Sequence, residues 1–113
     1  MFPNEIPNWI NGQECSSVSK EWFDKLNPAS GHILCRAARS RKEDVVLAVT
    51  AAKRAQPAWA EMPAVQRGLL LHKLVVAMQN RQAEIAAIVA AATVKSNKEA
   101  LGETGGPSQC GLL

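Results

Sequence analysis

The apolar residues of this 113-residue sequence change their period at Ser40, and that change limits what the chain can fold into. Before Ser40 they form short runs between turn residues. From Ser40 to Val94 they recur every three or four residues, as on one face of a helix. The recurring positions are Val45, Val49, Leu70, Leu74, Met78, Ile85 and Ile88. The sequence therefore predicts an α/β chain, with short antiparallel strands over about 8–37 and helices over about 41–103.

Two turn motifs organise the predicted strands. Asn11-Gly12 tolerates the positive φ angles of a type I′ turn, which predicts a β-hairpin around it. Asn27-Pro28-Ala29-Ser30-Gly31 predicts a second tight turn, because Pro28 fixes its own φ and Gly31 accepts a reversal of the chain. The strands expected on either side of these turns are Asn8–Ile10, Gln13–Cys15, Trp22–Leu26 and His32–Ala37.

The first helix is expected to begin at Ser40, because Ser40 and Glu43 have the spacing of a capping box. Its predicted apolar stripe is Val45, Ala48, Val49, Ala52 and Ala55. Pro57 should end or kink this helix, since proline lacks an amide hydrogen and clashes with the preceding turn. Trp59 and Met62 are expected to fill the corner that follows.

Three further helical segments are predicted. Pro63 suits the first turn of the second helix, and Asn80-Arg81 marks a break before the helical period resumes at Gln82. The apolar face expected for the second helix is Leu70, Leu71, Leu74, Val75 and Met78. Ser96 and Glu99 form another capping-box pattern. The end of the last helix is poorly defined, because helix-breaking residues follow at Gly102, Gly105, Gly106 and Pro107.

The apolar face between Leu70 and Val89 is larger than a few short strands can cover. Burying each of its larger side chains would contribute about 1.5–3 kcal/mol. We therefore expect a larger sheet, outside this sequence, to pack against it.

The charge pattern argues against a nucleic-acid partner. The net charge is +3, and the local cluster of basic residues is Arg36, Arg39, Arg41 and Lys42. Glu43 and Asp44 follow at once, which is typical of a solvated helix start. We expect no nucleic acid to bind.

The sequence also argues against a membrane partner. The longest apolar run, Ile85–Ala92, is far shorter than the roughly 20 residues of a membrane span. The N-terminal residues lack the apolar core of a signal peptide. Three irregularly spaced cysteines favour reduced thiols. We expect a cytoplasmic protein.

No set of residues completes a reaction, so no catalytic, cofactor-binding or metal-binding residue is predicted. Cys15, His32 and Cys35 lack the fourth ligand of a structural zinc site. His72 has no readable catalytic partner, and we expect it to be packed or at the boundary of the core.

Two other patterns are not expected to bind a ligand or to take part in catalysis. Gly102–Gly106 lacks the preceding strand of a dinucleotide-binding loop. Glu99 and Glu103 could share a helix face, but we expect solvated carboxylates rather than a catalytic pair.

Several motifs, in this order and spacing, resemble the N-terminal part of the aldehyde dehydrogenase superfamily. They are Asn8-Trp9-Ile10-Asn11-Gly12, Asn27-Pro28-Ala29-Ser30-Gly31, Ala51-Ala52 with Trp59, Arg67-Gly68-Leu69-Leu70, Leu74, Arg81, Glu84, Ile85, Lys95 and Glu99-Ala100-Leu101-Gly102-Glu103. The resemblance implies a segment of a Rossmann-like cofactor-binding domain, spanning residues 1–113.

The resemblance also implies a function for the full-length family. Its members oxidise aldehydes to carboxylic acids with NAD or NADP, through a cysteine nucleophile and a glutamate that activates water. The regions carrying those residues, and the segments for homo-oligomer formation, lie beyond Leu113. We therefore expect a truncated fragment that is inactive and binds no cofactor alone.

One similarity to the family is misleading, and the chain departs from the family pattern at two places. Gln109-Cys110 is similar to the family's nucleophile motif but lacks its spacer and comes far too early, so Cys110 is not expected to be the nucleophile. Ala92-Thr93-Val94-Lys95 stands where the family often has Glu-Thr-Gly-Lys, and Pro107 falls in what is usually a helix. These changes put the local turn and the last helix in question. The alternative function is a small helical module that binds another protein through the face from Leu70 to Val89.

Overall fold

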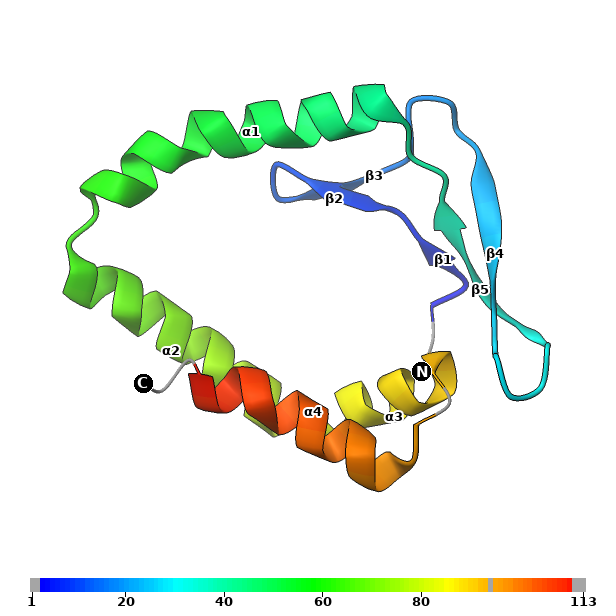
Figure 1. The fold of residues 1–113 in the computed structure, drawn as a ribbon. Helices are drawn as coiled ribbons and strands as arrows, with labels where there is room; N and C mark the ends of the chain where they lie inside the picture. Colours follow the sequence, from blue (N-terminus) through cyan, green and yellow to red (C-terminus); the bar gives the residue numbers. More distant parts are fainter. Residues whose placement is uncertain (1–2, 94, 111–113) are drawn as a thin grey trace. The chain divides into compact units, whose positions relative to one another are not determined.

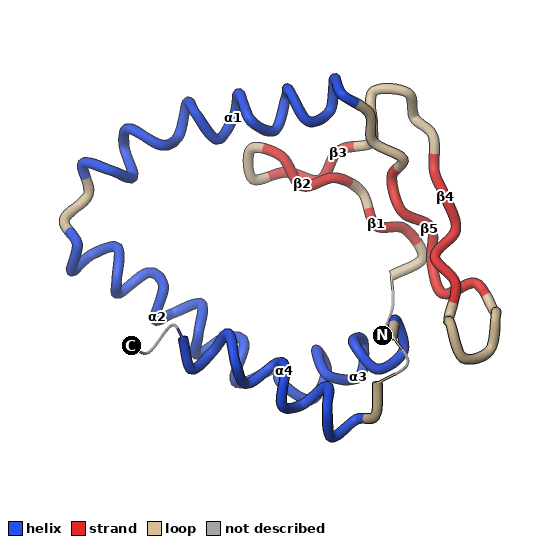
Figure 2. The backbone as a smooth tube through the Cα atoms, viewed as in Figure 1, coloured by secondary structure: helices blue, strands red, loops and turns tan. Residues whose placement is uncertain are grey.

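The computed structural model describes residues 3–93 and 95–110, which form strands followed by helices (Figures 1 and 2). The strands are β1 (Glu5–Ile6), β2 (Asn8–Ile10), β3 (Gln13–Cys15), β4 (Trp22–Leu26) and β5 (Ile33–Ala38). The helices are α1 (Lys42–Glu61), α2 (Ala64–Asn80), α3 (Gln82–Ala92) and α4 (Asn97–Cys110). The α/β composition predicted from the sequence is thus confirmed.

The chain divides into two compact units. The strand unit comprises 3–26 and 33–61, and the helical unit comprises 27–32 and 62–110. Each unit is described by itself.

The predicted hairpin is confirmed in the strand unit. β2 and β3 pair antiparallel, with Asn8 opposite Cys15 and Ile10 opposite Gln13. Asn11 and Gly12 between them have φ angles of 55° and 73°, the left-handed conformation that the turn requires. Local turn chemistry therefore sets the register of this hairpin.

A second sheet has the strand order β1-β5-β4. β4 and β5 pair antiparallel, as predicted, although β5 begins at Ile33 instead of His32 and ends one residue later than expected. The strands predicted over about 8–37 pair antiparallel, whereas β1, which lies before them and was not predicted, pairs parallel to β5. The two residues of β1 are too few to show an apolar period, which is why the sequence does not reveal this strand.

The turn between β4 and β5 uses the Asn27 side chain. Its Oδ1 accepts hydrogen bonds from the amides of Ala29 at 2.9 Å and Ser30 at 3.3 Å. Gly31 has a φ angle of 74°, which glycine adopts without steric cost. The predicted turn is confirmed, with Asn27 supplying part of its mechanism.

The beginning of α1 differs from the prediction. Ser40 does not cap the helix, because its Oγ donates a hydrogen bond to Asn8 Oδ1 at 2.8 Å. Instead, Asp44 Oδ2 accepts from the Arg41 amide at 2.8 Å, and Asp44 Oδ1 accepts from the Val18 amide at 2.8 Å. Asp44 is buried, so one carboxylate both caps α1 and anchors a loop 26 residues away.

Pro57 does not end α1, which continues to Glu61. Proline removes only the amide that would bond the Lys53 carbonyl, and Lys53 is exposed, so water can satisfy that carbonyl. Trp59 lies in the last turns of α1 with an exposed side chain, so the expectation that it fills the corner was wrong, whereas Met62 is half-buried. Pro63, with φ −54° and ψ 142°, immediately precedes α2.

The break between α2 and α3 is confirmed at Arg81, whose φ of −112° and ψ of 16° interrupt the helical path. Arg81 pairs with Glu84 through bonds of 2.9 Å and 2.7 Å. The last helix is longer than predicted, since α4 continues past Gly102 and Pro107 to Cys110.

Small residues form the contact between α3 and α4. Ala86 and Ala100 are buried, and so is Thr104, whose hydroxyl bonds the Ala100 carbonyl at 2.8 Å. Gln82 Nε2 donates to the Leu101 carbonyl at 3.2 Å, which fixes one end of the contact. The small size of these buried residues allows the two helices to approach closely.

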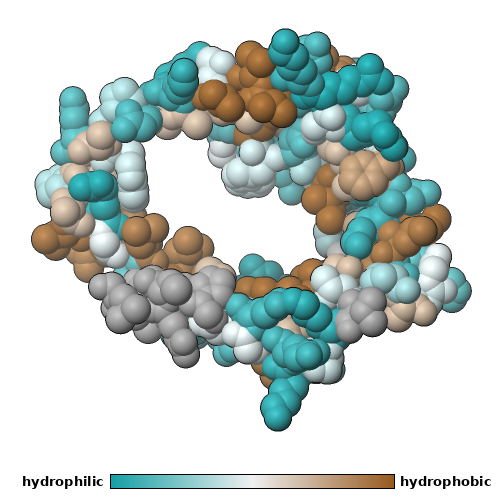
Figure 3. All heavy atoms as spheres, viewed as in Figure 1, coloured by the Kyte–Doolittle hydropathy of each residue, from teal (hydrophilic) through white to brown (hydrophobic). Residues whose placement is uncertain are grey.

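The larger apolar residues of α1 and α2 remain mostly exposed (Figure 3). Of the face predicted for α2, only Val75 is buried, whereas Leu70, Leu71 and Leu74 are 44%, 50% and 57% exposed. Val45 and Val49 of the predicted α1 stripe are also exposed. The predicted apolar faces of α1 and α2 form, but the rest of the described chain leaves most of their larger side chains exposed.

No helix in the described part of the chain is sufficiently long and apolar to span a membrane.

Candidate functional site

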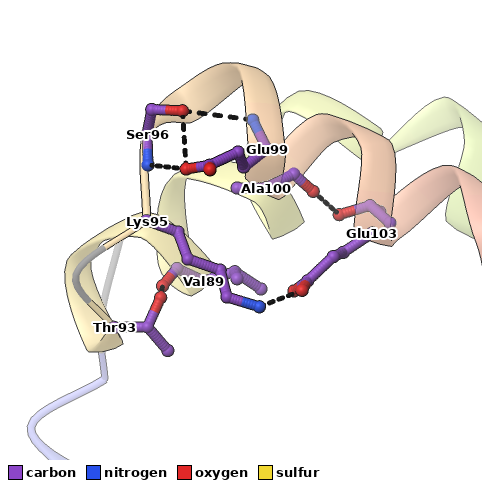
Figure 4. Close-up of polar contacts among 8 residues, drawn as sticks. Val89, Thr93, Lys95, Ser96, Glu99, Ala100 and Glu103 are labelled. Atoms are coloured by element: carbon purple, nitrogen blue, oxygen red, sulfur yellow. Dashed lines mark hydrogen bonds and ion pairs between the residues drawn. The ribbon is translucent and has the colours of Figure 1, made fainter.

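The densest polar cluster in the helical unit lies at the start of α4 (Figure 4). Glu99 Oε2 accepts from the amide and the hydroxyl of Ser96, both at 2.9 Å, and Ser96 Oγ accepts from the Glu99 amide at 3.3 Å. These reciprocal bonds confirm the predicted capping box at this position. They also lower the pKa of the Glu99 carboxyl, chiefly through the bond from the Ser96 amide.

Neighbouring residues form hydrogen bonds at the C-terminal end of α3 and an ion pair with α4. Thr93 bonds the Val89 carbonyl through its amide at 3.0 Å and its hydroxyl at 2.7 Å. Thr93 itself is extended, with φ −130° and ψ 170°, so α3 ends there without the glycine that the family often has. Lys95 forms an ion pair with Glu103. Val94, which takes the place of that glycine, lies outside the described residues.

The two carboxylates of the cluster do not form a catalytic pair. Glu99 and Glu103 are both exposed, and each is engaged by a different partner, Ser96 for the first and Lys95 for the second. This agrees with solvated carboxylates and does not resemble two carboxyl groups facing one substrate. The cluster therefore holds helix ends in place.

The structure does not bring the candidate metal ligands together. Cys35 is buried in β5, Cys15 is half-buried in β3, and His32 is exposed in the turn before β5. Within residues 3–93 and 95–110 there is no group of three His, Cys, Asp or Glu side chains able to hold a metal ion. The Cys110 side chain lies outside the described part.

His72 is exposed on α2, so the expectation of a packed or boundary histidine was wrong. Leu71 and Leu74 beside it are exposed as well. Gly102 and Gly105 lie within α4, where backbone amides bond along the helix and cannot cradle a phosphate.

The arginines near α1 are held by their own neighbours. Arg36 lies over the Trp22 ring at 4.8 Å and pairs with Glu5, while Arg39 lies 5.6 Å from the centre of the Phe23 ring. A further pair joins Arg41 and Glu21 at 2.8 Å; the hydrogen bond in this pair lowers the pKa of Glu21 and raises that of Arg41. These contacts stabilise the sheet and the α1 start.

Shallow hollows lie between the hairpin and α1. One of about 180 Å³ is lined by Asn8, Trp9, Ile10, Ser40, Asp44, Val45 and Ala48. Asp44 and Ser40 already use their polar atoms in structural hydrogen bonds. The Asn8 Nδ2 is buried and has no hydrogen-bond partner among the described residues, but an amide nitrogen is neither a general base nor a nucleophile, so these lining residues do not form a catalytic set.

Comparison with known proteins decides what the fold represents. Residues 13–110 match the model of the aldehyde dehydrogenase family. The chain belongs to the aldehyde dehydrogenase family. Its strands and helices correspond to an N-terminal segment of that fold, which confirms the resemblance of the sequence motifs.

Individual aldehyde dehydrogenases support the assignment. Lactaldehyde dehydrogenase of Escherichia coli K12 is 34% identical over 87 residues, which are 77% of this chain and 18% of that protein. The crystal structure of E. coli lactaldehyde dehydrogenase matches 93% of this chain and 22% of its own, with a TM-score of 0.88 and 30% identity. PnpE, solved with nicotinamide adenine dinucleotide, matches 86% of this chain and 20% of its own, with a TM-score of 0.83 and 33% identity.

This aldehyde dehydrogenase segment spans only about a fifth of the length of the relatives it matches.

Proposed function

We propose that this chain is the N-terminal part of an oxidoreductase that oxidises aldehydes to carboxylic acids with NAD or NADP, and that residues 1–113 belong to its cofactor-binding domain. The observation that carries the proposal is the family match over residues 13–110. The active cysteine, the glutamate that activates water and the substrate pocket belong to other parts of such an enzyme.

The exposed apolar faces support a structural role for this segment. α2 is apolar on several sides, because Val65, Leu69 and Val76 follow one another along one side and Leu70 and Leu74 along another. A helix that is apolar all round is normally buried within a larger core. We assign the covering layer to the remaining part of the aldehyde dehydrogenase domain.

The described residues do not fit a nucleotide cofactor. A dinucleotide site needs a glycine-rich turn between a strand and a helix, whereas Gly102 and Gly105 lie inside α4. The strand-to-helix connection before α1 is occupied by the bonds of Asp44 and the ion pair of Arg41. Cofactor binding is thus part of the proposal for the complete enzyme, with no contact assigned to this segment.

An activity assay tests the proposal that the isolated chain is inactive. The purified 113-residue chain would be mixed with NAD or NADP and a panel of aldehydes including lactaldehyde, and reduced nicotinamide would be followed by its absorbance. E. coli lactaldehyde dehydrogenase serves as the positive control. We expect no signal above the blank, and steady turnover in proportion to the amount of chain would contradict the proposal.

A second function is favoured by the same exposed face on α2: a small module that binds another protein without catalysis. Gel filtration distinguishes the two. A stable monomer with a compact elution volume favours the autonomous module, whereas self-association through uncovered apolar surface favours the segment of a larger domain.

Location and assembly complete the proposal. The two described cysteines, Cys15 and Cys35, are unpaired thiols, which supports a reducing, cytoplasmic setting. Homo-oligomer formation is proposed only for the complete enzyme. We propose no nucleic-acid partner, since Arg36, Arg39 and Arg41 are engaged within the chain.

A further inference from the structure

We draw no further inference here: the strongest candidate, the exposed apolar surface of α2 around Val65, Leu69 and Val76, belongs to the face already assigned to the rest of the family's domain, and nothing in the structure shows what else covers it.

Discussion

The contacts within the strand unit differ in kind from the contacts within the helical unit. In the strand unit, side-chain hydrogen bonds join segments far apart in sequence, such as Asp44 with the Val18 amide and Ser40 with Asn8. In the helical unit, small buried residues such as Ala86 and Ala100 bring helices together, while the polar contacts of Ser96 and Glu99 remain local. Long-range polar bonds specify position, whereas small-residue packing specifies how closely helices approach.

The comparison also shows where each unit is incomplete. Both carry exposed apolar side chains: α1 exposes Val45, Val46 and Leu47 and buries no apolar residue, while α2 buries only Val75. Both units therefore depend on the layer that we assign to the rest of the domain.

The largest expected effect comes from breaking the polar anchor of the strand unit. Asp44→Ala removes the buried acceptor of the part-buried Val18 and Arg41 amides, and the loss of both hydrogen bonds should cost about 3 kcal/mol. Hydrogen exchange should show loss of protection at both amides and in the first turn of α1.

Two control variants sharpen this test. Asp44→Asn keeps one carbonyl oxygen and should lose roughly half as much stability. Glu43→Ala, at an exposed neighbouring position, should change stability by less than about 0.5 kcal/mol. Equal behaviour of Asp44→Ala and Glu43→Ala would show that the anchor contributes nothing.

A smaller effect is expected from the core of the helical unit. Val75→Ala removes two methyl groups from a buried position and should cost about 2 kcal/mol. Val76→Ala is the matched control, because Val76 is 39% exposed and alanine favours the helix. Thermal unfolding should show a lower midpoint for the first variant and little change for the second. A larger decrease in the unfolding midpoint for Val76→Ala than for Val75→Ala would show that another side of α2 is buried.

The two serines with the capping-box spacing provide the next test. Ser96→Ala should destabilise the first turn of α4 by about 1 kcal/mol, since it removes the hydroxyl bonded to Glu99. Ser40→Ala should leave protection of the first turn of α1 unchanged, because Ser40 bonds Asn8 instead. Amide exchange at both helix starts measures the difference. If Ser40→Ala reduces amide protection in the first turn of α1, Ser40 does act as the helix cap, contrary to this account.

The smallest effect is a pH dependence at the start of α4. The folded-state pKa of Glu99 is lowered, so its contribution is present above the unfolded value of about 4.3 and disappears as the pH falls through the folded value. NMR should show increased amide exchange, corrected for its intrinsic pH dependence, at the start of α4 in acid. Glu99→Gln should remove this dependence, and an identical acid response in both proteins would assign it to another group.

Local chemistry explains which parts of the fold could be predicted from the sequence. Asn11-Gly12 and the turn at Asn27 specify their conformations through positive φ angles and nearby hydrogen bonds, so both were predicted correctly. The break at Arg81 was also predicted, from the interrupted apolar period. In each case the decisive contacts lie within a few residues.

Tertiary competition explains the failures. Ser40 and Ser96 have the same spacing to a glutamate, but near Ser40 a distant loop supplies the Val18 amide and Asn8 supplies an acceptor, so Asp44 takes over the helix start. The pairing of β1 with β5 likewise depends on a tertiary contact, and the two residues of β1 are too few to show a strand pattern in the sequence. The exposure of His72 and of the leucines on α2 could not be predicted from a pattern that shows which side is apolar but not what covers it.

The sequence predicts no catalytic or cofactor-binding residue within this segment. The sequence gives reasons for it at particular positions, such as the missing spacer before Cys110 and the missing strand before Gly102. The resemblance to the family rests on the order and spacing of several motifs. No single one of these motifs contains catalytic residues or is diagnostic by itself.

Equilibrium urea unfolding of the isolated chain, followed by helical circular dichroism, tests the central claim most directly. If these residues are one layer of a larger aldehyde dehydrogenase domain, the transition should be shallow, with an m-value below the range of about 1–3 kcal/mol/M found for small cooperative proteins. A single steep transition of a monomer, with an m-value within that range, would contradict the account and establish an autonomous domain.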